Sequence, residues 1–154
     1  MALMNVVKLP NELLHKISSE VDVFDKSLKK LVDDMFETMY KNNGIGLAGV
    51  QVGILKQIIV IDIDNEGEVF KSEVINPKIV SFSTEMSVME EGCLSVSDRT
   101  CKVNRPVEVV VEYQTADGEK HTIEAKGLIA KCLQHEIDHL KGITIIDREE
   151  GKVV

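Results

Sequence analysis

Residues 134–139 read Gln-His-Glu-Ile-Asp-His, so an HExxH pentad lies on the last apolar segment of the chain. The pentad contains two of the four histidines, His135 and His139, which are four residues apart. On an α-helix this spacing puts both imidazoles on one face, one turn apart, where they can bind one metal ion. Glu136 would then lie beside the ion and could accept a proton from a bound water. The spacing therefore indicates a catalytic metal site.

The segment that carries the pentad is expected to be a helix over residues 128–140, closed by Gly142. Apolar side chains cover much of its circumference, so we expect the helix to be largely buried. The alternative is that the pentad lies on a solvated face. Burying its polar groups without partners would cost roughly several kcal/mol, and ligation of a metal removes that cost.

A catalytic metal usually has three protein ligands and one open position. Downstream of the pentad the candidates are Asp147, Glu149 and Glu150, which lie on a polar tail. Upstream, Cys93 lies in the segment Glu-Gly-Cys-Leu-Ser at residues 91–95. A thiolate is a strong ligand for Zn²⁺ or Fe²⁺. The sequence therefore favours Cys93 as the third ligand.

Length and charge limit the class of protein. The 154 residues suit one catalytic domain over residues 1–154, and the net charge of −8 disfavours sequence-independent nucleic-acid binding. Three cysteines cannot all pair within the chain, which fits a reducing compartment, and Cys101 and Cys132 are expected to be small buried hydrophobic residues. With neither a membrane-spanning run nor a targeting pattern, we expect a cytoplasmic protein, or a matrix protein if a transit peptide was removed.

The hydrophobic pattern predicts an α+β fold in which antiparallel sheets surround the metal-binding helix. An N-terminal helix is expected over residues 25–42, with Asp25 as its cap. Pro77 predicts a break or an edge position in one of the strands. The strands are expected at residues 57–63, 69–80, 81–89, 107–113 and 120–125, with a hairpin turn at residues 115–118.

Residues 44–49, Gly-Ile-Gly-Leu-Ala-Gly, match the GxGxxG pattern of dinucleotide sites. Such a site needs a strand before the glycines and a helix after them, and here the order is reversed, so NAD and FAD are excluded. The simplest interpretation is a turn. A functional interpretation is that Gly46 leaves room for the backbone of a ligand. Gln51 would then offer an amide that can polarise a carbonyl.

Together, three segments resemble the peptide deformylase family: residues 44–51 (GIGLAGVQ), residues 91–95 (EGCLS) and residues 134–139 (QHEIDH). The resemblance spans nearly the whole chain and implies a metal-dependent hydrolase acting on a linear amide. Its reaction would remove the N-formyl group from the formyl-methionine of newly made polypeptides and release formate. The implied partners are these nascent peptides and, transiently, the ribosome, with no DNA and no membrane.

The resemblance also implies a role for each site residue. One divalent ion is expected, with Fe²⁺ as the native ion and Zn²⁺, Ni²⁺ or Co²⁺ as replacements, and its ligands would be Cys93, His135 and His139. The catalytic groups would be the Glu136 carboxylate, which moves the proton, and the Gln51 side-chain amide and Leu94 backbone N–H, which stabilise the oxyanion. The substrate-binding residues would be Gly46 and Glu91.

The chain departs from the family pattern in several places. Gly49 and Val50 replace the usual Ala-Pro, which predicts a looser loop and a lower rate. Ser97 replaces a common Pro, and Arg99 or Arg105 would stand in for a basic residue of the family. Residues 149–154 form an acidic-to-neutral tail where many bacterial members have a basic helix, so ribosome docking by that route is not expected.

Two other functions remain open on sequence alone. The pentad by itself would also suit a zinc peptidase of another kind, which would cleave unformylated peptides without releasing formate. A divergent member of the family could instead bind formylated peptides without turnover, and the altered pair Gly49-Val50 is the feature that supports this.

Overall fold

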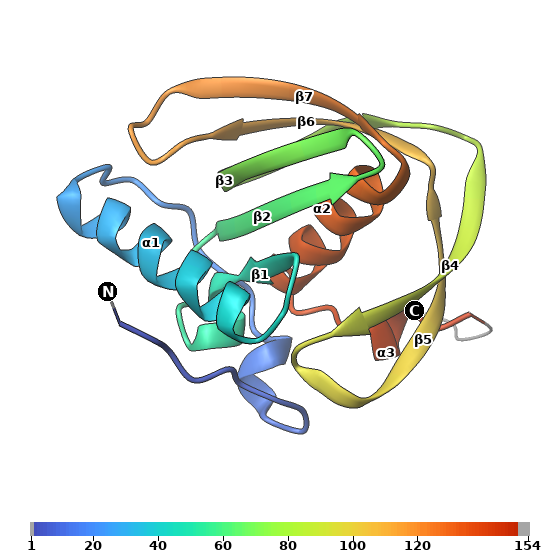
Figure 1. The fold of residues 1–154 in the computed structure, drawn as a ribbon, viewed down its shortest axis with the longest axis horizontal. Helices are drawn as coiled ribbons and strands as arrows, with labels where there is room; N and C mark the ends of the chain where they lie inside the picture. Colours follow the sequence, from blue (N-terminus) through green and yellow to red (C-terminus); the bar gives the residue numbers. More distant parts are fainter. Residues whose placement is uncertain (1, 151–154) are drawn as a thin grey trace.

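The structure is a computed structural model that describes residues 2–150, and its fold is α+β with antiparallel sheets, as predicted (Figure 1). In chain order the elements are a 3₁₀ turn η1 (Glu12–His15), α1 (Lys26–Lys41), β1 (Gly46–Ala48), a 3₁₀ turn η2 (Gly49–Val52), β2 (Ile58–Asn65), β3 (Glu68–Phe82), β4 (Met86–Cys93), β5 (Val96–Pro106), β6 (Glu108–Gln114), β7 (Lys120–Lys126), α2 (Gly127–Leu140) and α3 (Ile145–Arg148).

Helix α2 lies between two sheets. One sheet has five strands in the order β1-β2-β3-β6-β7, and the other is the β4–β5 hairpin. The five-stranded sheet curves over α2, and the hairpin lies on its other side (Figure 1). Residues 129–140 of α2 are all buried, as their apolar pattern predicts. The main core cluster joins α2 to this sheet through Ile59, Ile61, Val111, Leu133 and Ile137.

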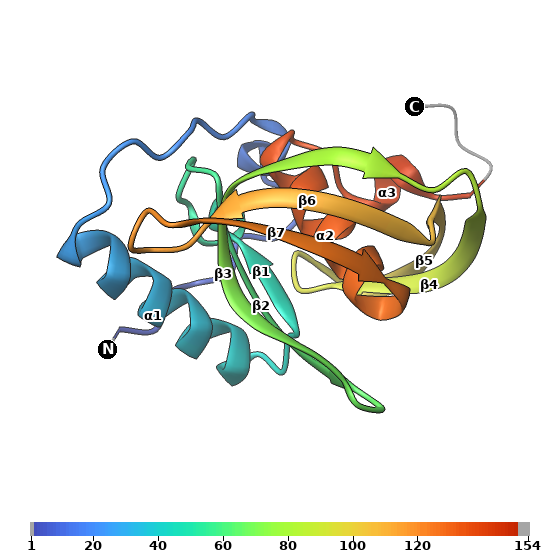
Figure 2. The same ribbon diagram turned by 90° about the horizontal axis from the view of Figure 1, so that it is seen from above.

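Helix α1 forms where the sequence predicts it. The Asp25 carboxylate accepts the N–H of Leu28 at 3.0 Å and so caps the first turn. The apolar face of α1 packs on β1 and β2 and forms a second core cluster that includes Met35, Met39 and Leu47. Seen from above, α1 lies at the opposite end of the molecule from the β4–β5 hairpin (Figure 2).

Several strand boundaries differ from the prediction. β3 continues through Pro77 to Phe82, and its register with β6 shifts between Ile75 and Lys78, so the proline lies at an irregularity and does not end the strand. β5 was not predicted, because charged and polar residues interrupt its apolar pattern. Residues 46–48, which the glycine pattern suggests to be a turn, form the short strand β1.

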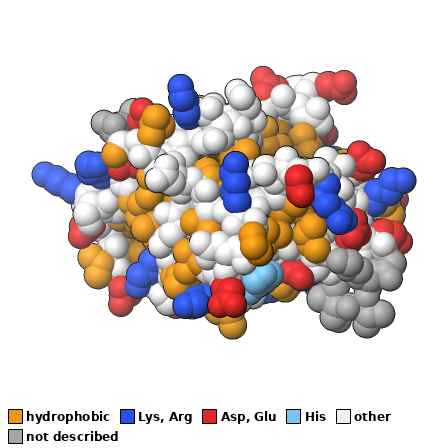
Figure 3. Space-filling model, turned by 90° about the horizontal axis from the view of Figure 1, so that it is seen from below, with side chains coloured by type: hydrophobic (Ala, Val, Ile, Leu, Met, Phe, Trp, Pro, Cys, Tyr) orange, Lys and Arg blue, Asp and Glu red, His pale blue; other side chains and the backbone are white. Residues whose placement is uncertain are grey.

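No helix among residues 2–150 has the length and apolar character needed to span a bilayer. On the face shown in Figure 3, acidic and basic side chains are interspersed and do not gather into a basic patch.

Candidate active site

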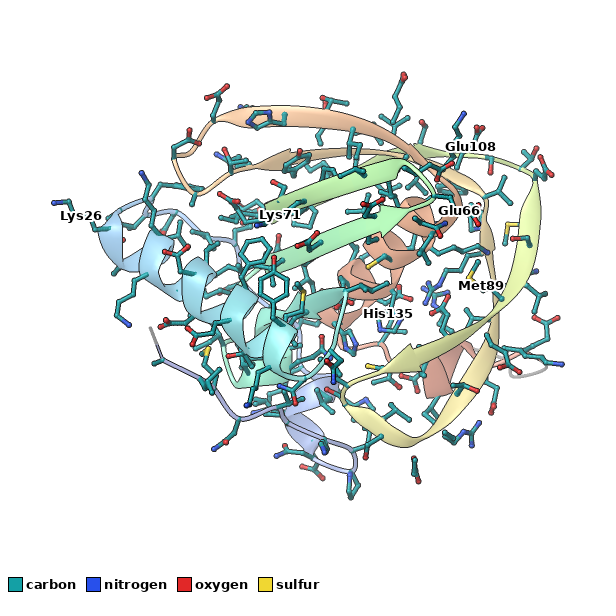
Figure 4. All side chains as sticks on the ribbon, viewed as in Figure 1. Lys26, Glu66, Lys71, Met89, Glu108 and His135 are labelled. Carbon is teal, nitrogen blue, oxygen red and sulfur yellow. The ribbon has the colours of Figure 1, made fainter. Side chains whose placement is uncertain are left out.

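Three potential metal ligands converge where the end of β4 meets α2. The Sγ of Cys93 lies 3.3 Å from Nε2 of His139. One ligand atom from each of Cys93, His135 and His139 lies within 4.8 Å of the other two. Figure 4 shows His135 on α2, on the side of the helix that faces the β4–β5 hairpin. The structure therefore brings together the three ligands that were expected from the sequence.

The end of the β4–β5 hairpin places the thiol. Cys93 pairs with Val96 across a two-residue turn, so residues 91–95 form the end of the hairpin. The Leu94 side chain is partly buried and packs against the second core cluster, close to Gly44. This packing anchors the turn on one side, and Cys93 faces His139 of α2.

The downstream candidates for the third ligand lie elsewhere. The Asp147 carboxylate accepts the backbone N–H of Thr144 at 2.9 Å and caps α3. Glu149 forms an ion pair with Arg99. Neither residue, nor Glu150, belongs to the cluster of possible metal ligands found among residues 2–150, whose third member is the upstream thiol.

A buried carboxylate orients the first histidine of the pentad. Oε1 of Glu91 lies 3.0 Å from Nδ1 of His135, and Arg105 donates to both Glu91 oxygens at 2.6 and 2.9 Å. Burial raises the pKa of Glu91, but hydrogen bonds from His135 and Arg105 outweigh it and hold the pKa at about 2. An ionised Glu91 accepts Nδ1–H, which leaves the Nε2 lone pair of His135 free for a metal.

Asp138, the fourth residue of the pentad, joins α2 to two neighbouring segments. It accepts from Nη1 of Arg105 at 2.8 Å, and from Nε and Nη2 of Arg148 at 3.2 and 3.1 Å. Sequence reasoning gave Asp138 no role, although its place within the pentad put it on the metal-bearing helix. It ties that helix to β5 and to α3.

The Glu136 carboxylate is buried beside the ligands. Its Oε2 lies 3.9 Å from Nε2 of His135, and its Oε1 has no hydrogen-bond partner within residues 2–150. Burial raises the pKa of Glu136 to about 7. A carboxylate in this state can exchange a proton near neutral pH, and its unpartnered oxygen is available to a water molecule.

The Gln51 side chain is held with its amide directed toward the thiol. Its Oε1 accepts the backbone N–H of Ala48 at 2.9 Å, and its Nε2 donates to Oγ of Ser95 at 3.1 Å. The same Nε2 lies 3.6 Å from Sγ of Cys93. Ser95 was not predicted to support the site, although it belongs to the EGCLS segment.

The turn that carries Gln51, where the missing Ala-Pro pair predicts a looser loop, is buried and closely packed. All four residues of η2 are buried. A Cβ on Gly49 would lie 2.8 Å from the carbonyl oxygen of Ile54 and 3.0 Å from that of Lys56. The glycine therefore lets the backbone after the turn pack closely against it, and this packing holds the turn in place of a proline ring.

A cavity of about 860 Å³ opens onto this cluster. Its wall includes seven of the eight predicted site residues: Gly46, Gln51, Glu91, Cys93, Leu94, His135 and Glu136. A Cβ on Gly46 would lie 2.7 Å from Oε2 of Glu136 and 2.8 Å from Sγ of Cys132. Only glycine lets β1 pass this close to α2 at the edge of the cavity.

The chemistry of the cluster suits a divalent transition metal. One thiolate and two imidazoles are soft or intermediate donors, which bind Zn²⁺ or Fe²⁺ in preference to Mg²⁺ or Ca²⁺. Metal–sulfur and metal–nitrogen bonds of about 2.3 and 2.1 Å need ligand atoms only a few Å apart, as they are here. Burial lowers the pKa of His135, but Glu136, Cys93 and Glu91 outweigh it and hold the pKa well above normal. This is a negative environment that favours a cation.

The family model described as polypeptide deformylase matches residues 3–153. The chain belongs to the peptide deformylase family. A peptide deformylase of Rhizobium meliloti is 47% identical over 148 residues, which is 96% of this chain and 85% of that protein. One from Zymomonas mobilis is 45% identical over 152 residues, again 96% of this chain and 86% of the relative.

Solved structures of peptide deformylases have the same fold. The structure from Ehrlichia chaffeensis in complex with actinonin has a TM-score of 0.94 and 42% identity, covering 98% of this chain and 91% of that one. The Thermotoga maritima structure has a TM-score of 0.92 and 38% identity, covering 97% of this chain and 99% of that one.

Of the two arginines that could serve as the family's basic residue, Arg105 is buried beside the candidate metal site and Arg99 lines the cavity.

Proposed function

We propose that this deformylase removes the N-formyl group from the N-terminal formyl-methionine of newly made polypeptides, giving formate and a free amine. The single observation that carries the proposal is the convergence of Cys93, His135 and His139 beside the buried Glu136 carboxylate. Three possible metal ligands beside a proton acceptor are the arrangement that metal-assisted amide hydrolysis needs.

Cys93, His135 and His139 would hold one divalent ion, with Fe²⁺ as the expected native ion and Zn²⁺, Ni²⁺ or Co²⁺ as replacements. When bound, such an ion lowers the pKa of a water molecule to about 7 and polarises the carbonyl. Because a thiolate ligand is open to oxidation, an iron-loaded sample is expected to lose activity in air.

Glu136 is assigned the proton transfers. With a pKa near 7 and an oxygen that has no protein partner, it can accept a proton from the attacking water. The same carboxyl group then donates that proton to the nitrogen of the leaving amine. Its burial keeps bulk water away from this exchange.

Gln51 and Leu94 are assigned to stabilising the negative charge that develops on the carbonyl oxygen. The Gln51 amide is aimed by two hydrogen bonds, one from Ala48 to its oxygen and one from its nitrogen to Ser95. The Leu94 backbone N–H lies in the tight hairpin turn directly after Cys93. Preorganised donors of this kind each contribute roughly 10²–10³ in rate.

The substrate backbone is expected to lie along β1. This strand is at the edge of the five-stranded sheet, so one side of it is available for pairing with a peptide. Gly46, at its start, borders the cavity. The Glu91 carboxylate already bonds to Arg105 and His135, so we assign its side chain to orienting the metal ligand and leave only its backbone to bind substrate.

The partners follow from this reaction. The substrates would be nascent formylated peptides, met in the cytoplasm of a bacterial cell or in an organelle matrix, with transient contact to the ribosome. The bacterial origin of the relatives supports this setting.

The binding-only alternative is not favoured. It depends on an altered loop at Gly49 and Val50, but that loop is buried and holds Gln51 in place. The peptidase alternative has less support, because Cys93, and not a downstream residue, lies within reach of both histidines.

The test is formate release from formyl-Met-Ala-Ser, measured with and without a chelator. The proposal predicts that chelation abolishes formate release and that readdition of metal restores it. Glu136→Ala should lower kcat by about 10²-fold or more, whereas Glu108→Ala, at an exposed position on β6, should not. Unchanged activity in Glu136→Ala would remove the proposal.

A further inference from the structure

One buried cation lies in the wall of the active-site cavity and has no part in the proposed chemistry. Lys131 is 3% exposed and is the one buried lysine within residues 2–150. Its Nζ donates to the carbonyl oxygens of Ser87 at 2.5 Å and of Arg105 at 3.3 Å. In the described part of the chain it forms no ion pair. An ammonium with two neutral acceptors retains a third N–H that can donate to a ligand.

The position of this ammonium relative to the reacting centre follows from the helix. Leu128, Lys131, Cys132, His135 and Glu136 all line the cavity. Their spacing places them along one face of α2, and one helical turn is about 5.4 Å long. Lys131 is therefore about one turn from His135, toward the N-terminal end of α2.

The facing strand gives the same order. Ser87, Met89 and Glu91 alternate along β4 and so share one of its faces, and Cys93 follows at its end. Met89 lies on the side of β4 toward α2 (Figure 4). Nζ of Lys131 contacts Ser87, which is two residues before Met89 on β4. The ammonium therefore lies farther along β4 from Cys93 than Met89 does.

Around Lys131 and the ligands the cavity wall includes the apolar residues Ile45, Met89, Leu128 and Cys132. A peptide paired along β1, with its formyl group at Cys93, would place its first side chain in this part of the cavity. The pocket would therefore contact the part of the side chain near the backbone with apolar groups and would offer its tip an N–H donor, that of Lys131.

Resting on the proposed function, we propose that Lys131 determines specificity for the first side chain and selects for a hydrogen-bond acceptor at its tip. The thioether of methionine is a weak acceptor and norleucine has none. The sulfoxide oxygen of oxidised methionine is a strong acceptor, and burying it without a donor is costly. The substrate class assigned to this pocket therefore includes N-formyl-methionine sulfoxide as well as N-formyl-methionine.

The test compares kcat/KM of the metal-loaded enzyme on three peptides, each ending in Ala-Ser and beginning with formyl-methionine, formyl-methionine sulfoxide or formyl-norleucine. The key quantity is the ratio of the sulfoxide value to the norleucine value. Lys131→Met keeps an unbranched side chain without the charge and is expected to lower this ratio by about tenfold or more, the effect of losing one charge-assisted hydrogen bond. Lys141→Met, at an exposed position beyond α2, is the matched control and should leave the ratio unchanged.

A smaller change in the ratio, or an equal loss on all three peptides, would show that Lys131 only clamps the hairpin to α2, and would overturn the inference. If Lys131→Met does not fold, the wild-type enzyme alone tests the proposal. Its kcat/KM for the sulfoxide peptide must then be about a tenth of its kcat/KM for the norleucine peptide, or more. A lower value overturns the proposal. If no peptide releases formate, the proposed function fails. Calorimetric binding of the unformylated methionine-sulfoxide and norleucine peptides then tests the inference by the same ratio.

Discussion

Nη1 of Arg105 lies 2.8 Å from Oδ2 of Asp138, and this ion pair joins β5 to α2, the helix that carries His135 and His139. Both side chains are buried. The same guanidinium holds Glu91, which in turn contacts His135. Arg105 therefore sets the position of the β4–β5 hairpin relative to α2, and with it the distance between the thiol and the imidazoles.

Removal of this arginine should destabilise the fold. Arg105→Ala leaves the buried carboxylate of Glu91 without its arginine partner and the buried Asp138 with Arg148 alone. We expect a loss of about 3–5 kcal/mol in the free energy of unfolding. Urea denaturation measures this free energy. The control is Arg99→Ala: the Arg99 side chain is 43% exposed, so its removal should lower the free energy of unfolding by about 1 kcal/mol or less. Equal losses in the two variants would contradict the account.

Removal of the Gln51 amide should affect the rate and leave the fold intact. Gln51→Met keeps the size of the side chain but removes the donor that faces Cys93. We expect kcat/KM for formyl-Met-Ala-Ser to fall by about 10²–10³. Gln57→Met, whose amide contacts the carbonyl of Ser18, should keep its activity. A Gln51 variant with unchanged kinetics would rule out the assigned donor role.

The closeness of β1 to α2 predicts an effect of adding a methyl group. In Gly46→Ala the Cβ would approach Glu136 and Cys132 at 2.7 and 2.8 Å, so one of them must move. We expect kcat/KM to fall about tenfold or more, because misplacing a catalytic group is costly. Cys132→Ala in the same background removes one of the two contacts and should recover part of the loss. No change in Gly46→Ala would contradict the described packing.

The turn before β2 predicts an effect on stability. Gly49→Ala introduces the residue that is usual in the family, yet here its Cβ would meet the carbonyls of Ile54 and Lys56. We expect a loss of about 1–3 kcal/mol in the free energy of unfolding. Gly92→Ala is the control, because its Cβ would meet only a Thr100 methyl at 3.9 Å. If Gly49→Ala instead raises the free energy of unfolding, the carbonyls of Ile54 and Lys56 do not exclude a Cβ at this position.

The helix over residues 127–140 and the convergence of Cys93, His135 and His139 could be predicted because the necessary signals are local or chemical. The pentad spacing fixes two imidazoles on one helical face, and a thiolate is the strongest remaining donor. The capped helix α1 was likewise predictable from Asp25 and the apolar period. The family resemblance added the assignment of Gln51, whose position no local pattern determines.

The supporting contacts could not be predicted from local pattern. Arg105 and Asp138 are 33 residues apart, and their pairing depends on how the hairpin meets α2. β5 lacks a clear apolar alternation and forms because β4 provides its partner. Lys131 looks like an ordinary surface lysine until both neighbouring strands are in place around it.

The most direct test of the central claim is the metal content per chain of anaerobically purified wild type and Cys93→Ala. The account predicts about one divalent ion per chain in the wild type, bound by one thiolate and two imidazoles, and a large loss of that ion in the variant. A Cys93→Ala protein that keeps a full equivalent of metal would contradict the account.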